Sequence, residues 1–169
     1  RSHSDSEVLV HLWEEFGPSA LAKLRGEFAL IVWDGHTQTL HAARDNFGVR
    51  SLVYHQGADH VLQLASESKA LFAMGVERAL SPSAVVQAFS HQYLYPDHTM
   101  FTGVRRLPPG GHLRAQLAGD GRLTIHLETL QSPQSAIVDA SITSRSPKDF
   151  AATADEVRAT VRSALNDRL

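Results

Sequence analysis

The chain has 169 residues and no cysteine, which excludes a disulfide scaffold, a thiolate metal site and a cysteine nucleophile within it. Hydrophobic residues make up 43% of the chain and charged residues 20%, proportions typical of a folded globular protein. The formal net charge of -2 offers no basic excess for binding phosphates, so we expect no nucleic-acid partner. No apolar run approaches the ~20 residues that span a bilayer and no signal peptide is visible, so we expect no membrane partner and a cytoplasmic location.

Two helices are predicted at the start of the chain. Ser4 and Glu7 form a capping-box pattern, in which each side chain satisfies an amide of the first helical turn. Apolar residues then recur at helical spacing at Leu9, Leu12, Trp13 and Phe16. Gly17-Pro18 ends this helix, and residues 18–24 predict a short second one.

Strands in antiparallel pairs follow. Residues 28–33 form a nearly continuous apolar run, typical of a strand covered on both faces, and residues 39–43 are its partner across a turn at Asp34-Gly35. Residues 52–55 and 60–65 predict a second hairpin.

The rest of the chain alternates helices with one more hairpin. A helix is predicted from Ser66 to Gly75, and another from Ser81-Pro82 to about Phe89. Residues 90–110 have no regular pattern, and residues 111–116 and 122–127 predict a third hairpin. A Ser/Gln/Pro-rich linker then leads to an amphipathic helix from Phe150 to Leu169. This order, without βαβ alternation, indicates an α+β fold.

Three features are candidates for chemistry. The ten histidines are scattered without the i, i+4 spacing of a helical metal site, so we interpret them as surface and loop residues and expect no bound metal. The segment Arg44 to Gly48 either orients a ligand or closes a tight loop, and its residue types favour the loop. Asp5, at a helix start, either caps or charges the first helical turn or has a functional role, and the residue alone favours the first interpretation.

Several segments in order resemble one family. They are residues 4–9 (SDSEVL), 24–29 (LRGEFA), 33–34 (WD), 43–48 (ARDNFG), 65–71 (ASESKAL) and 101–110 (FTGVRRLPPG). Their order and spacing resemble the class II glutamine amidotransferase domain of glutamine-hydrolysing asparagine synthetases. The final helix, residues 156–169, is similar to the helix that opens the synthetase domain of that family.

The resemblance implies a fold and a reaction. The fold is the N-terminal-nucleophile αββα sandwich, with two antiparallel sheets between helical layers. A cysteine at the mature N-terminus attacks the glutamine side-chain amide, and an Asn-Gly pair stabilises the oxyanion. The ammonia released then reaches a second domain, where ATP, magnesium and aspartate form an aspartyl-adenylate that becomes asparagine.

Only one substrate contact carries over to this chain. Asp5 matches the family aspartate that binds the α-ammonium group of glutamine. Arg44, Asp45 and Gly48 match a loop of the family that we interpret as structural. The cysteine, the oxyanion pair and the carboxylate-binding arginine have no match here, so no catalytic residue is expected, and we expect the chain to be an interior part of a longer enzyme that is inactive alone.

The resemblance also implies a division of the chain. Residues 1–127 are expected to be the amidotransferase domain without its nucleophile segment, residues 128–148 a linker, and residues 149–169 the start of the synthetase domain. Glutamine is the expected ligand of the first domain, which is incomplete at its N-terminus. ATP, magnesium and aspartate are expected on the missing synthetase domain, with no cofactor on this chain, and a homodimer is left open.

Two alternatives remain. Ser51 and Val53 stand where the family often has Pro and Tyr, which keeps open an adenylating cyclase of the β-lactam synthetase or lasso-peptide cyclase type that does not use glutamine. The presence of Asp5 weighs against that alternative, because a domain without glutamine needs no ammonium partner. A degenerate, non-catalytic scaffold domain is the other alternative.

Overall fold

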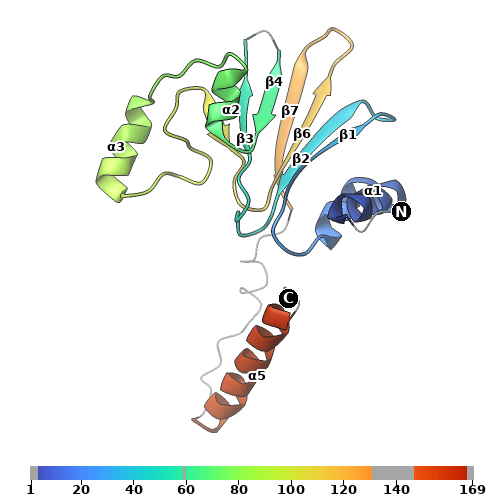
Figure 1. Cartoon of the computed structure of the whole chain (residues 1–169), viewed down its shortest axis with the longest axis vertical. Coiled ribbons are helices and arrows are strands. Elements are labelled where there is room, and N and C mark those ends of the chain that lie inside the picture. The colour runs from blue at the N-terminus through green and yellow to red at the C-terminus, as the bar shows by residue number, and fades with distance from the viewer. Residues whose placement is uncertain (1–3, 59, 131–146, 167–169) are drawn as a thin grey trace. The chain divides into compact units, whose positions relative to one another are not determined.

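The computed structural model describes residues 4–58, 60–130 and 147–166. The chain divides into two units, Arg1–Pro133 and Gln134–Leu169, which are considered separately. In the first unit, the strands of three hairpins and one further short strand form two antiparallel sheets (Figure 1).

The first sheet has the strand order β1-β2-β6-β7 and the second has the order β4-β3-β5. Their strands are β1 (Ala29–Asp34), β2 (Thr39–Arg44), β3 (Val53–Gln56), β4 (Leu62–Ala65), β5 (Val104–Arg106), β6 (Gly111–Leu117) and β7 (Leu123–Thr129). The three predicted hairpins are confirmed. The three-residue strand β5 lies inside the segment for which no regular structure was predicted.

Two of the helices begin where their caps predict, whereas the helix predicted from Ser66 begins two residues later, at Ser68. Ser4 precedes α1 (Asp5–Phe16), and the Ser4 hydroxyl accepts a hydrogen bond from the Ser6 amide at 3.3 Å. Ser81 caps α3 (Pro82–His91) in the same way, with an acceptor distance of 3.3 Å from the Ala84 amide. The short second helix is a 3-10 helix, η1 (Gly17–Lys23), and α2 (Ser68–Ala73) follows β4.

The main core lies between the two sheets. It contains buried residues from β2, β3 and β6 and from the loops that connect the sheets, namely Ala42, Leu52, Tyr54, Leu107, Leu113 and Ala115. The outer face of the second sheet packs on α2 through Leu71, Val53 and Val104. On the outer face of the first sheet, Trp13 of α1 contacts His41 of β2. The expected αββα arrangement is therefore confirmed.

The expectation that both faces of the first strand are covered is wrong. Ile31 and Trp33 of β1 are 48% and 57% exposed. They pair with Ala42 and Leu40, so they point to the side of the first sheet that faces the second sheet. β1 is an edge strand, and the three-stranded second sheet leaves it uncovered. An apolar run indicates that a segment tends to be buried, but it does not show whether its strand lies at the centre or at the edge of a sheet.

Two loops cross between the sheets, and Arg44 and Asp45 hold both of them. The loop after β2 leads to β3, and the loop after β5 leads to β6. The buried Arg44 guanidinium donates to the Arg50 carbonyl at 2.5 Å in the first loop, and to the Leu107 carbonyl at 2.8 Å in the second. The main-chain carbonyl of Asp45 accepts from the Gly110 amide at 2.8 Å. The sheets are thus tied together at one end.

The Asp45 carboxylate shapes the first of these loops. It accepts hydrogen bonds from the amides of Phe47, Val49 and Arg50 at 3.0–3.1 Å. Burial alone would raise the pKa of this carboxyl, but the amide hydrogen bonds outweigh burial and hold the pKa below its ordinary value. Gly48 has a φ of +64°, and a Cβ there would come within 2.9 Å of Arg44 and Pro109. The interpretation of this segment as a structural loop is confirmed.

The second unit contains α5 (Pro147–Asn166), on which Phe150, Val157, Val161 and Leu165 are exposed at helical spacing. Most of the predicted linker and the predicted end of this helix fall outside the described residues. β7 extends to Thr129, two residues beyond the predicted end of its strand. Within the described ranges, we find no helix long and apolar enough to cross a membrane.

We predict that Asp45→Asn lowers the free energy of unfolding by about 2–3 kcal/mol, because a neutral amide cannot accept from all three backbone donors. The low native pKa stabilises the folded state above about pH 4, and this stabilisation is lost as the pH falls through that pKa. The free energy of unfolding, measured in urea between pH 3 and 7, should therefore fall less steeply toward low pH in the variant than in the unchanged protein.

Asp120→Asn is the matched control. Asp120 accepts from the Arg122 amide at 2.9 Å in an exposed turn, so its removal should cost less than about 0.5 kcal/mol. Equal losses in the two variants would show that the Asp45 carboxylate does not organise the loop.

Candidate functional site

Asp5 is the first residue of α1, and its side chain is exposed. The Ser4 hydroxyl already serves as the cap of this helix, so the Asp5 carboxylate is not needed for capping. With the described residues, the Asp5 carboxylate makes no hydrogen bond or ion pair. Asp5 lies in the first turn of the helix, where the helix dipole attracts negatively charged side chains.

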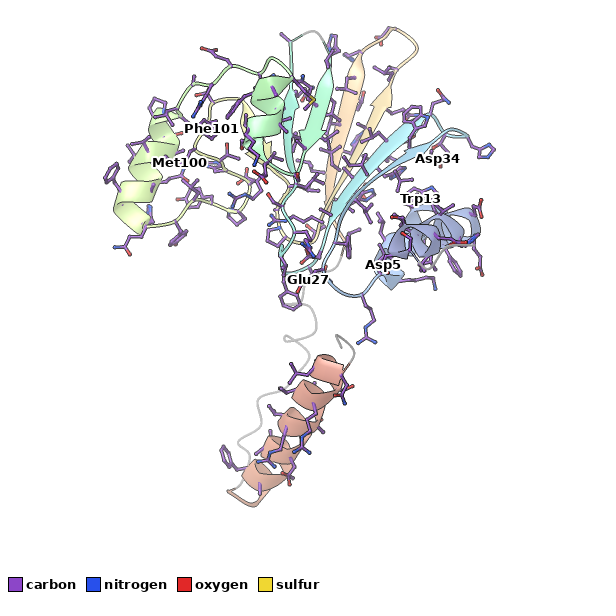
Figure 2. All side chains as sticks on the ribbon, viewed as in Figure 1. Asp5, Trp13, Glu27, Asp34, Met100 and Phe101 are labelled. Atoms are coloured by element: carbon purple, nitrogen blue, oxygen red, sulfur yellow. The ribbon has the colours of Figure 1, made fainter. Side chains whose placement is uncertain are left out.

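A hollow of about 340 Å³ lies beside Asp5. One wall is the start of α1, with Asp5 and Leu9, and the other walls are the turn before β1 and the start of that strand, with Glu27 and Leu30. Figure 2 shows Asp5 and Glu27 on these separate segments. This volume is in the range of sites for small molecules. A charged rim over an apolar floor suits a small ligand with a cationic group.

The turn that carries Glu27 is shaped by a glycine. Gly26 has a φ of +109°, a conformation that side chains other than glycine rarely adopt. This turn brings Arg25 and Glu27 to the same hollow as Asp5. The sequence reasoning gave no role to Arg25 or Glu27. The one available signal was the glycine between two charged residues directly before a strand.

A second hollow of about 520 Å³ continues from the first between α1 and β1. The two hollows share Leu9 and Leu30, and Trp13 and Val32 line the second one further along. Together they form a groove that runs from Asp5 along the unpaired edge of β1. Within the described residues, therefore, α1 and β1 are separated by a groove along much of their length.

Two histidines do not fit the prediction of surface and loop positions. His41 on β2 and His112 on β6 are only 2% and 5% exposed, and their rings are hydrogen-bonded to each other. The prediction was wrong for this pair because residues 71 positions apart in the sequence become neighbours only when β2 pairs with β6. In the ranges that the structure describes, we find no group of three or more His, Asp or Glu side chains able to hold a metal ion.

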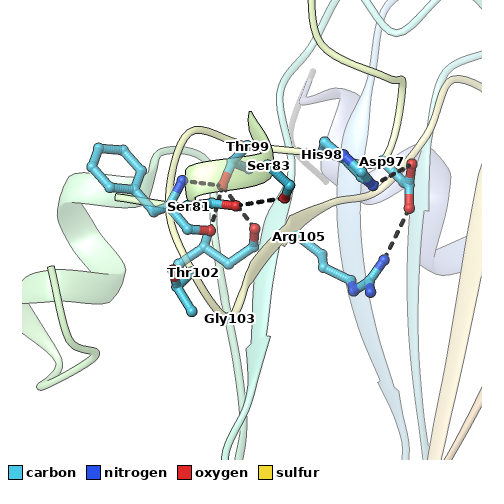
Figure 3. A pocket seen from close by; sticks show the side chains of 10 residues that line it. Ser81, Ser83, Asp97, His98, Thr99, Thr102, Gly103 and Arg105 are labelled. Atoms are coloured by element: carbon cyan, nitrogen blue, oxygen red, sulfur yellow. Dashed lines mark hydrogen bonds and ion pairs between the residues drawn. The ribbon is translucent and has the colours of Figure 1, made fainter. Parts of the chain in front are cut away.

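A third hollow, of about 280 Å³, lies at the start of α3 (Figure 3). Its polar side chains bond to each other or to the backbone. Arg105 Nη1 lies 3.0 Å from Asp97 Oδ2, Ser81 Oγ lies 3.0 Å from Ser83 Oγ, and the Thr99 hydroxyl donates to the Val104 carbonyl at 2.7 Å. These bonds hold the loop between α3 and β5, and we assign this hollow no ligand.

Comparison with known proteins points to the same part of the chain. Residues 1–124 match the family model of the glutamine amidotransferase domain. The chain is 38% identical over 111 residues to amidase chyE of Penicillium rubens, which covers 65% of this chain and 16% of that protein. It is 39% identical over 114 residues to amidase chry2 of Gibberella zeae, covering 66% of this chain and 16% of that protein.

A bacterial relative is similar over the same region. The chain is 32% identical over 117 residues to asparagine synthetase (glutamine-hydrolyzing) 1 of Bacillus subtilis, which covers 69% of this chain and 18% of that protein. The chain thus spans less than a fifth of the length of each of these three relatives.

We predict that Ser4→Ala loosens the first turn of α1 and with it the place of Asp5. Loss of an N-cap hydroxyl costs about 1 kcal/mol, and the Ser6 amide loses its acceptor. Hydrogen exchange should become faster in the first turn of α1 and stay unchanged in β2 and β6. Ser4→Asn is the control, because asparagine also caps helices, and it should restore slow exchange. Equal exchange in all three proteins would contradict a capping role for Ser4.

Proposed function

Because this chain belongs to the glutamine amidotransferase family, we propose that it forms the glutamine-binding part of an enzyme that hydrolyses glutamine and passes the ammonia to an acceptor. The observation that carries this proposal is the Asp5 carboxylate at the rim of a hollow of about 340 Å³. In this proposal Asp5 binds the α-ammonium group of glutamine.

The chemistry of Asp5 supports this role. An ionised carboxylate forms a charge-assisted hydrogen bond with an ammonium group, which is stronger than a bond between neutral partners. A site built for that charge rejects an analogue without the ammonium group, because the carboxylate is then desolvated without a partner. Since Ser4 caps α1, the Asp5 carboxylate can accept from a ligand without cost to the helix.

The nucleophile must come from polypeptide outside these 169 residues, because none of them is a cysteine. The groove beside β1 is where we place the segment that carries it. β1 is an edge strand, and its unpaired side can accept a further strand. A strand there would run beside Asp5 and so bring its side chains to the bound glutamine.

The finer proposal is asparagine synthesis in the longer protein, with aspartate as acceptor. ATP and magnesium would activate the acceptor carboxylate. The residues of this chain do not fit those two ligands: the sequence has no glycine-rich phosphate loop, and the described residues form no cluster of metal ligands. We therefore assign ATP and magnesium to another part of the protein and derive no step through them. Residues 1–127 then form the amidotransferase domain, residues 128–148 the linker and residues 149–169 the start of the synthetase domain.

A second candidate is amide hydrolysis that ends with free ammonia. The observation that favours it is that two of the similar relatives carry the name amidase. The two candidates differ in their products. Asparagine formation from aspartate, ATP and glutamine by the protein from the complete coding sequence supports the first, and ammonia release unchanged by aspartate and ATP supports the second. Production of neither would favour a scaffold domain.

We predict that Asp5→Asn raises the KM for glutamine at least about tenfold in the protein from the complete coding sequence. The reason is that one charge-assisted hydrogen bond contributes about 1.5–3 kcal/mol. In the same variant, the KM for glutamine should become more similar to the KM for an analogue that lacks the α-amino group. Steady-state ammonia release with both substrates measures the two effects.

Glu15→Gln is the matched control, since it removes a carboxylate from the exposed side of the same helix. Its KM should equal that of the unchanged protein. A KM that is the same in Asp5→Asn and Glu15→Gln would remove Asp5 from the glutamine site.

A further inference from the structure

A buried pair of histidines lies on the face of the first sheet that α1 covers. His41 Nδ1 is 3.0 Å from His112 Nε2, and the two rings stack with their centroids 5.2 Å apart and their planes at 16°. Both residues are buried. The pair bridges β2 and β6 directly.

The hydrogen bond fixes how protons are placed on the pair. A bond between two ring nitrogens requires one N–H and one lone pair. The Glu128 carboxylate lies 3.8 Å from His112 Nδ1, which favours a proton on that nitrogen. His112 Nε2 then accepts, and His41 Nδ1–H donates. A first added proton can go to His41 Nε2 without breaking this bond, but a second proton on His112 Nε2 breaks it and places two cations side by side.

The charges around the pair come from each element packed against it. β1 brings Asp34, β6 brings Arg114, and β7 brings Glu128, whereas α1 brings the uncharged ring of Trp13. On α1, His11 lies 3.7 Å from the Glu7 carboxylate and 3.3 Å from the Glu14 carboxylate. Burial, more than any of these charges, lowers the pKa of His41 and of His112, so both rings are neutral near pH 7.

Trp13 connects the pair to Asp5. Its ring meets the His41 ring edge to face, with centroids 4.9 Å apart at 64°. No residue of α1 is buried, and a groove of about 520 Å³ lies between α1 and β1, so this ring contact is a main link between the helix and the sheet. Asp5 lies eight residues before Trp13 on the same helix, a distance of about 12 Å along the axis. A helix this short moves as a rigid unit.

We propose that His41 and His112 are positioning residues for Asp5, and that double protonation of the pair displaces Trp13 and α1 and so weakens glutamine binding. This inference rests on the proposed role of Asp5. It predicts that the KM for glutamine rises only at a pH well below about 6.5, the ordinary pKa of histidine, because burial lowers the pKa of both rings and the second proton is added beside a cation. Near neutral pH the pair is uncharged and α1 keeps its contact with the sheet. The two titrations are coupled, so the change belongs to the pair and to neither ring alone.

The first experiment measures the KM for glutamine between pH 4.5 and 8 in the protein from the complete coding sequence. We expect a rise of about fivefold to tenfold toward pH 4.5. His41→Asn keeps an N–H close to the place of Nδ1, but it removes the titrating ring and the contact of that ring with Trp13. Its KM should therefore be raised already at pH 7.5 and should not change with pH. His126→Gln on the exposed side of β7 is the control and should keep the full pH dependence.

A second experiment does not depend on glutamine. Trp33→Phe leaves Trp13 as the single tryptophan, and its fluorescence is followed over the same pH range. We expect an acid transition that His41→Asn abolishes. A Trp13 transition with a KM that stays flat would overturn the positioning role, and so would a KM change that His41→Asn leaves intact. A normal KM in Asp5→Asn together with a Trp13 transition would instead overturn the proposed function and leave the histidine pair as a pH-sensitive contact.

Discussion

The first unit depends on the neighbouring side chains of Arg44 and Asp45, each of which bonds to backbone groups of the crossing loops. The chain passes twice between the two sheets, and the Arg44 guanidinium bonds to a carbonyl in each of the two crossing loops. A guanidinium and a carboxylate buried without such partners would destabilise the fold, because their desolvation would be uncompensated. Here backbone groups satisfy both of them. The sheets are thereby held face to face, and the apolar side chains of β2, β3 and β6 meet in one core.

Arg44 and Asp45 lie at the end of β2, and their hydrogen bonds to the loops also determine which side chains of that strand point to its opposite face. Side chains along a strand alternate, so placing Ala42 in the core between the sheets places His41 on the outer face. A shift of one residue in this register would move His41 into the core and remove the partner of Trp13. The contact between α1 and the sheet therefore depends on the same loops that join the sheets.

The sequence predicted those parts of the fold that local chemistry determines. Ser4 and Ser81 marked helix starts and the Asp34-Gly35 turn marked a hairpin, because caps and turns involve residues a few positions apart. β5 could not be predicted in this way, since its three residues are a strand only through pairing with β3. The exposure of Trp33 depends on strand order, and the burial of His41 depends on a partner 71 residues away. Glu27 reaches the hollow beside Asp5 through the backbone turn at Gly26, and the glycine alone does not show where that turn leads.

Whether a carboxylate at a helix start is available to a ligand depends on what satisfies the first amides of the helix. An aspartate that caps its own helix would have to give up a hydrogen bond before it could bind an ammonium group, and the net gain would be small. In this chain Ser4 accepts from the Ser6 amide, and Asp5 stands one position later with no bond to the described residues. Helix capping is thus the role of Ser4, and in the proposed function ligand binding is left to the neighbouring Asp5. Asp5 lies in the first helical turn without acting as the cap, so its carboxylate can bind a cationic ligand while the cap of the helix stays in place.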